Sequence, residues 1–293
     1  GVIACGSMTT DLLRAEIQAT QALTKKPFGV NLIVMHPDLD ALIEVCGEEG
    51  VGCVVLAGGI PPRKAMRRVK EFGATLIALT PALGIAKKLI RDGADALVIE
   101  GTEAGGHIGP VSTSVLAQEI LPNVQDVPVF VAGGIGRGEA MLSYLEMGAA
   151  GCQLGTRFVC ATESVAHPDF KKAFFKGSAR DATASVQVDP RFPVIPVRAL
   201  ANNATRKFAE TQHEVIARWR TGKLDQKAAQ LEIEHFWAGA LRRAVIDGDV
   251  ENGSLMAGQS VGMVTTEQPT AEIIQSLLDQ AADALIQRAA GAA

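Results

Sequence analysis

The regular alternation of short apolar runs with amphipathic helical segments constrains the fold of this chain more than any other feature. Runs that are apolar on both faces and separated by helices are typical of a parallel sheet covered by helices. Seven such runs occur: residues 2–4, 28–34, 53–56, 75–79, 96–99, 129–132 and 151–154. The order shows no reversal, so the sequence predicts an α/β fold.

A helix is expected after each of the first six strands. In the second helix, Leu39, Leu42, Ile43 and Cys46 form an i, i+3, i+4, i+7 stripe. For the first helix we expect Thr10 or Asp11 as the N-cap. The six expected helices cover residues 11–23, 39–46, 62–72, 83–91, 112–121 and 139–147.

The chain begins inside a strand-like run, Gly1-Val-Ile-Ala4, so we expect one further strand to precede it. Seven strands and that one make eight, the number in a (β/α)8 TIM-type barrel. A doubly wound open sheet is the alternative, because sequence alone does not show closure. We therefore predict an N-terminally truncated barrel over residues 1–198.

Beyond Phe158 the alternation ends, and a helical subdomain is predicted over residues 199–293. Its expected parts are two long helices (199–220 and 224–246), a glycine-rich return (248–262) and a final helix. In that last helix the apolar stripe is Ile273, Ile274, Leu277, Leu278 and Leu285. We expect the return to bring Gly258-Gln259 towards the active site, and the last helix to pack on the barrel.

Composition excludes several classes of function. The chain has 293 residues, a formal net charge of −4 and 4% aromatic residues, which gives no reason to expect nucleic acid or a membrane surface as partner. Its five cysteines are scattered, with no C-x-x-C, which favours a reducing compartment over a disulfide or zinc framework. No apolar run reaches about 20 residues. A cytoplasmic protein without a metal site is expected.

The segment from Glu100 to Gly109 (EGTEAGGHIG) is the candidate centre of chemistry. It follows an apolar strand, and barrel active sites lie at the carboxyl ends of the strands. Glycines such as Gly105 and Gly106 leave backbone amides accessible to a ligand. A lone histidine is more often structural, but His107 lies among four glycines at a strand end. We therefore take it as a candidate acid or base.

Two later strand ends predict a phosphate site. If one strand precedes the chain, the loops with Gly133-Gly134 and with Gln153-Leu-Gly155-Thr156 follow strands seven and eight, where this fold usually holds phosphate. The alternative is that these glycines only form tight turns. The spacing of Gly134, Gly136 and Gly138 is not the dinucleotide fingerprint, so a Rossmann fold is disfavoured.

Other polar residues receive weaker interpretations. Asn31 lies inside an apolar strand and should face a ligand or a structural partner. His167 and His213 are interpreted as a helix start and an exposed helical position. The basic helix Arg63–Lys70 is interpreted mainly as a solvated face, with docking of an acidic partner as the alternative.

Five motifs together resemble one flavoprotein family, which contains nitronate monooxygenases (2-nitropropane dioxygenases) and FMN-dependent bacterial enoyl-acyl-carrier-protein reductases. The resemblance covers essentially the whole chain. The family's barrel begins with a strand that ends in a Gly-Gly-Met-like turn against the flavin, and this strand is not in the sequence. The motifs are PFGVN (27–31), EGxEAGGHIG (100–109), AGGI (132–135), QxGTRF (153–158) and GSxMAGQ (253–259).

The resemblance implies FMN, with its phosphate in the loops at Gly133-Gly134 and Gly155-Thr156. It places Asn31 and Glu100 near the flavin and ribityl chain, and His107 on the substrate side. The cofactor-binding set it implies is Asn31, Glu100, Gly105, Gly106, Gly133, Gly134, Gln153, Gly155 and Thr156.

The resemblance also suggests a reaction. The expected one is NAD(P)H-dependent reduction of a 2-enoyl thioester, with a small-molecule or carrier-bound acyl substrate and a homodimer as one possible assembly. Oxidation of alkyl nitronates by flavin and oxygen is the alternative within the family. A flavin-free phosphate-binding barrel, either a lyase or synthase or a binding protein, is the alternative from another class.

Overall fold

The computed structural model describes residues 1–6, 8–237 and 239–291, and its contacts divide the chain into two compact units. The first unit contains residues 1–100, 114–131 and 145–151, and the second contains residues 101–113, 132–144 and those from 152 onward. Each unit is assembled from segments that are not contiguous in sequence. The expected boundary between residues 198 and 199 therefore stays a prediction.

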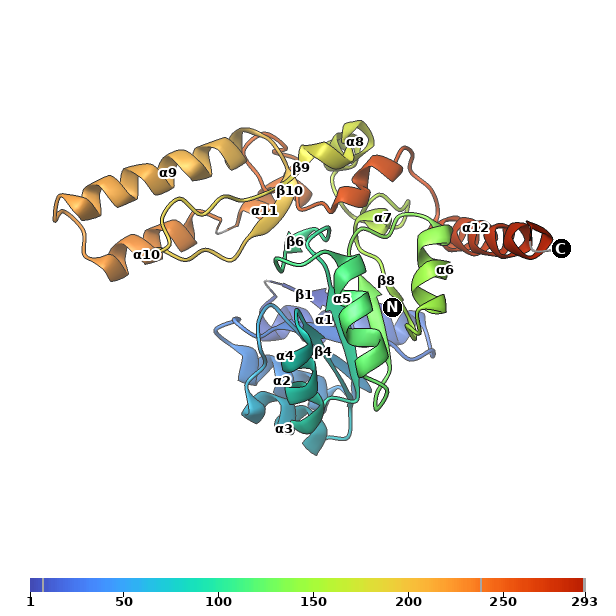
Figure 1. Ribbon diagram of the computed structural model, residues 1–293. Helices are drawn as coiled ribbons and strands as arrows, with labels where there is room; N and C mark the ends of the chain where they lie inside the picture. Colours follow the sequence, from blue (N-terminus) through green and yellow to red (C-terminus); the bar gives the residue numbers. More distant parts are fainter. Residues whose placement is uncertain (7, 238, 292–293) are drawn as a thin grey trace. The chain divides into compact units, whose positions relative to one another are not determined.

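The main sheet has seven strands in the order β1-β2-β3-β4-β5-β7-β8 (Figure 1). Pairing from β1 through β5 is parallel and in chain order. Strand β3 buries four of its five residues, which explains why its sequence is apolar without alternation. The predicted α/β class is confirmed. The seven strands are β1 (Val2–Cys5), β2 (Gly29–Ile33), β3 (Cys53–Ala57), β4 (Thr75–Thr80), β5 (Ala96–Glu100), β7 (Val129–Ala132) and β8 (Gly151–Gln153).

The helices between these strands lie close to where the periodicity predicts them. In α2 the stripe residues Leu39, Leu42, Ile43 and Cys46 are all buried. The helices are α1 (Thr10–Leu23), α2 (Leu39–Glu48), α3 (Arg63–Glu71), α4 (Leu83–Arg91), α5 (Thr113–Ile120) and α6 (Gly138–Glu146), with the 3-10 turn η1 (Leu121–Asn123) after α5.

The N-cap predicted for α1 is wrong by one residue or more. Thr10 is already helical, and the cap is Thr9, whose hydroxyl oxygen accepts the Leu12 N–H at 3.3 Å. Thr9 has extended backbone angles, which is the conformation that lets a side chain reach the first free amides of a helix. Three consecutive polar residues, Thr9 to Asp11, could each have served, so the sequence did not distinguish them.

The second unit contains a small antiparallel sheet that the sequence did not predict. Its order is β6-β10-β9, with two to four residues in each strand. Such short strands give no detectable alternation of polar and apolar residues. The second unit contains the elements β6 (Gly106–His107), α7 (Thr156–Val159), α8 (Pro168–Lys176), η2 (Ala179–Asp181), β9 (Ala182–Ala184), β10 (Val197–Leu200), α9 (Asn203–Arg220), α10 (Gln226–His235), α11 (Ala240–Val245), η3 (Gln259–Met263) and α12 (Thr270–Gly291).

Two long helices predicted in this unit are shorter than expected. Residues 199–200 belong to β10, and α9 begins only after Asn202, whose side chain accepts the Thr205 N–H at 3.1 Å. The same Asn202 amide donates to the carbonyls of Val250 and Gly253. The predicted helix 224–246 is two helices, because Gly239 adopts a left-handed φ of 69° just before α11.

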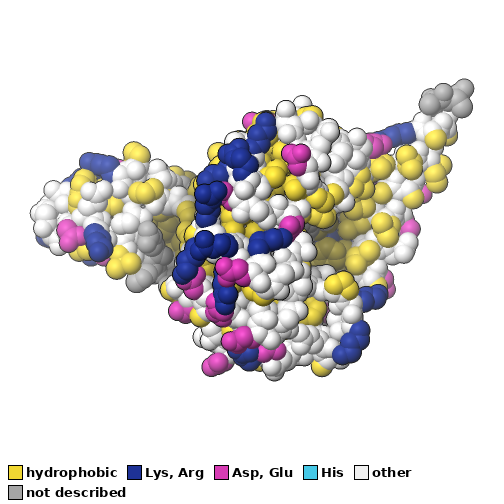
Figure 2. All heavy atoms as spheres, turned by 90° about the horizontal axis from the view of Figure 1, so that it is seen from below, with side chains coloured by type: hydrophobic (Ala, Val, Ile, Leu, Met, Phe, Trp, Pro, Cys, Tyr) yellow, Lys and Arg dark blue, Asp and Glu magenta, His cyan; other side chains and the backbone are white. Residues whose placement is uncertain are grey.

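The closing helix is confirmed, but only part of its apolar stripe is covered. Ile273 and Leu277 are buried, and they cluster with Ala161. Leu278 and Leu285 are about half exposed, at 51% and 55%. Figure 2 shows apolar side chains along this helix. Within residues 1–6, 8–237 and 239–291, we find no helix with the length and apolarity needed to cross a membrane.

Candidate active site

His107 lies on strand β6 rather than on an open loop. In the pairing with β10, His107 stands opposite Val197 and Gly106 stands opposite Arg198. Gly106 has a φ of +82°, a left-handed conformation that glycine adopts without strain. The backbone of His107 is thus fixed by the sheet, while the residue stays in contact with solvent on one side and with protein on the other. A fixed backbone with an accessible imidazole suits a group that has to meet a substrate.

Desolvation by the surrounding protein lowers the pKa of His107 below its ordinary value of 6.5. The imidazole is therefore mainly neutral at pH 7, with one nitrogen that donates and one that accepts a hydrogen bond. A neutral ring orients a carbonyl or accepts a proton more readily than it supplies one.

The glycine-rich return meets the histidine-bearing loop. The Gln259 N–H donates to the Glu103 carbonyl at 2.9 Å, and the Gly258 N–H donates to the Thr156 hydroxyl oxygen at 2.9 Å. A Cβ on Gly105 would lie 2.5 Å from the Gly258 nitrogen, so a larger residue would push the two segments apart. As the sequence predicts, Gly258-Gln259 comes back to this loop.

Glu103 is part of the support of this region. One of its carboxylate oxygens accepts both the N–H and the hydroxyl of Thr113, at 2.8 and 2.9 Å. Thr113 is the first residue of α5, where an acidic group also offsets the helix dipole. A Cβ on Gly134 would lie 3.0 Å from the Cβ of Glu103, and one on Gly133 would lie 3.0 Å from the Thr113 hydroxyl. Packing and positive φ values together require glycine at both positions.

Backbone amides of the two predicted phosphate loops are free to bind an anion. In the described part of the chain, no protein acceptor meets the N–H groups of Gly134, Ile135, Gly155 and Thr156. A Cβ built on Gly155 would meet nothing within 4 Å, so there is room beside it for a ligand group. Free amides beside open space are what a phosphate needs, and these residues fit one. Gln153, next to this loop, is exposed.

Asn31 and Glu100 belong to the first unit. Asn31 is half-buried in β2, and among the described residues its side-chain amide has no hydrogen-bond partner. Glu100 ends β5, and burial raises the pKa of its carboxyl to about 7. Neither group has a side-chain partner among the described residues. The ligand or structural partner expected for Asn31, and the place near the flavin that the resemblance implies for Glu100, stay predictions.

Comparison with known proteins identifies the family. A family model described as nitronate monooxygenase matches residues 1–46 and 38–280. The chain belongs to the nitronate monooxygenase family. Proteins of this family are flavin-dependent oxidoreductases, and the chain is an enzyme of this class. The resemblance inferred from the five motifs is therefore confirmed.

Particular relatives cover most of the chain. FabK from Thermotoga maritima is 36% identical with a TM-score of 0.88, covering 100% of this chain and 88% of that one. The (3aS,4S,5R,7aS)-5-hydroxy-7a-methyl-1-oxo-octahydro-1H-indene-4-carboxyl-CoA dehydrogenase of Mycobacterium tuberculosis is 30% identical, over 95% of this chain and 84% of that protein. The nitronate monooxygenase of Paraburkholderia phytofirmans is 27% identical, over 94% and 84%. The FabK match also confirms the TIM-barrel class.

Other titratable groups of this family member play structural parts. His167 caps α8, accepting the Asp169 N–H at 3.2 Å, and His213 is an exposed position of α9, as interpreted from the sequence. Burial raises the pKa of Cys46 to about 12 and that of Cys152 and Cys160 to about 11, so none of these three is a thiolate nucleophile at neutral pH. Within the described residues, no group of three His, Cys, Asp or Glu side chains could hold a metal ion.

The basic helix α3 is covered with ion pairs. Its cations pair with acids of neighbouring elements or of its own last turn: Arg63 with Asp92, Lys64 with Asp40, Arg67 with Glu71, Arg68 with Glu44 and Glu71, and Lys70 with Asp95. Figure 2, seen from below, shows basic and acidic side chains side by side over this part of the surface. Because the charges are compensated locally, α3 offers little net attraction to an acidic partner.

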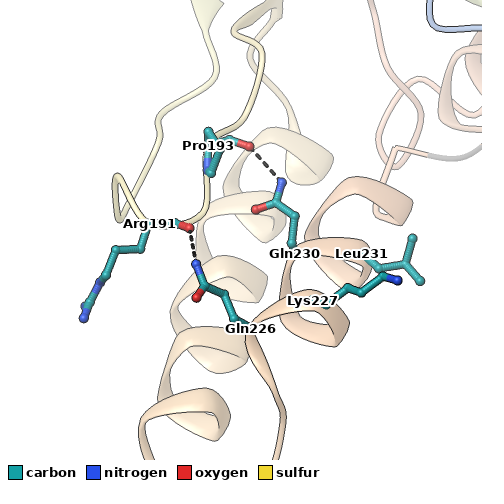
Figure 3. Close-up of a pocket in the computed structure, with 6 residues that line it drawn as sticks. All are labelled: Arg191, Pro193, Gln226, Lys227, Gln230 and Leu231. Atoms are coloured by element: carbon teal, nitrogen blue, oxygen red, sulfur yellow. Dashed lines mark hydrogen bonds between the residues drawn. The ribbon is translucent and has the colours of Figure 1, made fainter.

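A shallow pocket in the second unit lies apart from the histidine-bearing loop in sequence. It is formed by the segment at Arg191 and Pro193 and by one side of α10. Figure 3 shows the side-chain amides of Gln226 and Gln230 donating to the backbone carbonyls of Arg191 and Pro193, at 3.3 and 2.9 Å. These bonds attach the irregular segment 189–196 to α10. The pocket has no acid–base pair and no nucleophile, so it is not the candidate active site.

Arg198 is the residue of this region that the sequence analysis missed. It lies in β10 and is only 8% exposed, although arginine is rarely buried without partners. Its Nε donates to the carbonyl of Thr102 at 2.8 Å, and its Nη1 donates to the carbonyl of Ala182. The available signal was a charged residue inside an otherwise apolar run, Val194 to Leu200.

Proposed function

We propose that this chain is an FMN-dependent oxidoreductase that uses NAD(P)H to reduce the double bond of a 2-enoyl thioester. The observation that carries the proposal is the 36% identity to FabK, an enoyl-acyl-carrier-protein reductase, over all of this chain. The Mycobacterium tuberculosis relative is named as a carboxyl-CoA dehydrogenase, so it too acts on a thioester. In the proposed reaction C3 of the thioester gains a hydride and C2 a proton, while NAD(P)H is oxidised.

In this proposal the phosphate of FMN is held by the free amides at Gly134, Ile135, Gly155 and Thr156. Gly133, Gly105, Gly106 and Gln153 complete the loops around it, as the resemblance implies. The same resemblance implies Asn31 and Glu100 as further residues of the flavin site. Bound FMN would supply the hydride-transfer chemistry. Two observations support this. Among the described residues these four N–H groups have no protein hydrogen-bond acceptor, and there is open space beside Gly155.

His107 is proposed to orient the thioester. Its lowered pKa makes the neutral ring the main form at pH 7. An N–H of that ring can donate to the thioester carbonyl, which holds the substrate and stabilises charge that develops on the oxygen. Protonation of C2 by the imidazolium is the other role open to it, and that role requires the minor, charged form.

Oxidation of alkyl nitronates is the second candidate, supported by the family model and by the Paraburkholderia phytofirmans relative. There a neutral His107 would donate a hydrogen bond to the nitro group. The flavin-free barrel has lost its support, because membership of a flavin-dependent family leaves it without an observation in its favour.

One set of measurements distinguishes these functions. The purified protein is expected to bind FMN with a flavin absorption spectrum, to consume NADH or NADPH with crotonyl-CoA, and to take up little oxygen with propionate 3-nitronate. Fast oxygen uptake without crotonyl-CoA reduction would favour the nitronate enzyme. A protein that stays colourless with added FMN would contradict both.

The role of His107 has its own test. His107→Ala should lower kcat/KM about 100-fold, within the range measured for acid–base and hydrogen-bonding groups. His213→Ala, on an exposed face of α9, is the matched control and should leave it unchanged. If the neutral ring is the active form, the pH profile of the wild type should fall only below pH 6.5, and this limb should vanish in His107→Ala. An activity that rises as pH falls through that range would instead assign proton donation.

A further inference from the structure

The loop from Thr102 to His107 is held at both ends by one residue of another segment. Arg198 donates from Nε to the carbonyl of Thr102 at 2.8 Å, where the loop begins. The backbone of the same residue stands opposite Gly106 in the β6–β10 ladder, where the loop ends. Only a long side chain with donors at its end can connect the two, because the strand position is fixed by pairing.

The guanidinium is also tied to the third strand of this sheet. Nη1 donates to the carbonyl of Ala182, and the backbone of Arg198 pairs with Ala184. The two carbonyl acceptors thus come from different segments, and the planar fork of donors meets both at once. Lysine, a point charge on a flexible stem, cannot reproduce this geometry.

Keeping a charged group at this position has a cost in stability. Burial lowers the pKa of Arg198, an effect partly offset by the carboxylate of Glu103. Buried ion pairs and charges seldom add stability over apolar residues of similar size. An arginine in an apolar strand therefore calls for a role other than stability. Two of its contacts, the Nε bond to the Thr102 carbonyl and the backbone pairing with Gly106, fall on the segment that carries His107.

We propose that Arg198 is a positioning residue that fixes the Thr102–His107 loop and thereby the imidazole of His107 for the reaction. The inference rests on the proposed function of His107. It predicts that Arg198 acts through His107, and that loss of the guanidinium loosens the loop while the phosphate-binding amides at Gly134, Ile135, Gly155 and Thr156, which lie in other segments, stay in place.

A double-mutant cycle tests the proposal. Arg198→Met should lower kcat/KM about 100-fold, as small misplacements of a catalytic group can do. In a His107→Ala background, Arg198→Met should lower kcat/KM by less than about 3-fold, because the effects of substitutions at two residues that act as one unit are not additive. Arg198→Lys can donate to the Thr102 carbonyl but cannot meet both carbonyls with a planar fork, so it should recover only about tenfold of the loss seen in Arg198→Met. Equal losses in both backgrounds would overturn the proposal.

Lys171→Met is the matched control. Lys171 is also a buried cation, 6% exposed, that donates to the Ala161 carbonyl and to Glu267, both at 2.8 Å, but it does not contact the loop. Its loss should destabilise the protein and leave kcat/KM within about 3-fold. A loss of activity equal to that of Arg198→Met would show that removing any buried cation suffices, which would contradict positioning.

Amide hydrogen exchange separates this inference from the proposed function. In Arg198→Met, but not in Lys171→Met, the amides of residues 102–108 should exchange at least about tenfold faster, with the FMN Kd within about 3-fold of wild type. If His107→Ala alone leaves activity intact, the function assigned to His107 fails, while the exchange result still tests whether Arg198 fixes the Thr102–His107 loop. Unchanged exchange in Arg198→Met would show that Arg198 does not fix this loop.

Discussion

The core of the first unit and the loops around His107 in the second unit are stabilised internally by different kinds of contact. In the first, parallel strands bury aliphatic side chains, and Val54, Leu56 and Leu97 are fully inaccessible. In the second, the loops around His107 are held by hydrogen bonds to backbone carbonyls and by glycines that leave no room for a Cβ, such as Gly105. We therefore expect substitutions in the core of the first unit to reduce stability, and those in the loops around His107 to reduce function before stability.

The largest effect is expected in the sheet. Leu97→Ala removes a fully buried side chain from β5 and should lower the free energy of unfolding by about 2–5 kcal/mol, through lost burial and the remaining cavity. Leu278→Ala, on a half-exposed position of α12, is the control and should cost less than about 1 kcal/mol. Urea denaturation measures both. A costly Leu278→Ala would show that this face of α12 is covered in solution.

Glu100 is the exception within the first unit, and its effect depends on pH. Its folded pKa of about 7 lies above the ordinary value of 4.5, so the folded protein binds this proton more tightly than the unfolded chain. The proton on Glu100 stabilises the folded protein below pH 4.5. This contribution to the free energy of unfolding, roughly 3 kcal/mol at most, is lost as the pH rises from 4.5 to 7. Glu100→Gln should therefore be more stable than wild type at pH 8 and similar to it at pH 4. A constant difference between the two proteins would contradict the raised pKa.

Gly155 tests whether a glycine of the second unit serves the ligand or the turn. Because a Cβ there meets open space and its φ of −113° is not left-handed, Gly155→Ala should leave the free energy of unfolding within about 1 kcal/mol. If a phosphate occupies that space, the FMN Kd should rise about tenfold, or 1.4 kcal/mol. Gly84→Ala, with equally open space in α4, should leave FMN binding unchanged. Unchanged binding in both would favour the tight-turn interpretation.

The smallest effect is expected on the surface of the first unit. Lys64 pairs with Asp40 between α3 and α2, and both side chains are about 70% exposed. Such pairs contribute little because water screens them, so Lys64→Ala should change the free energy of unfolding by less than about 1 kcal/mol. Activity with a carrier-bound substrate should also stay the same. A selective rise in its KM would revive the docking role of this helix.

Periodicity predicted the sheet and its helices because burial alone decides them. The stripe of α2 and the strands β1 to β5 follow from which residues are apolar. Where several polar residues could serve equally, as at Thr9, the sequence left the cap ambiguous. In the long helical stretch 224–246, local propensity favoured one helix, and the break at Gly239 needed a backbone angle that composition does not reveal.

The sequence by itself determined the fold class, the family and the candidate residues, because strand–helix alternation and glycine motifs are local patterns. Only the tertiary structure decided how His107 is held: by pairing of β6 with β10, by the bond from Gln259 to Glu103, and by Arg198, which is 91 positions away along the chain. Contacts of this kind depend on strand pairing between distant segments, and the pairing partner of a two-residue strand leaves no periodic trace in the sequence. The motif in the sequence therefore identifies His107 as the candidate reactive group, while the position of His107 depends on the folded backbone.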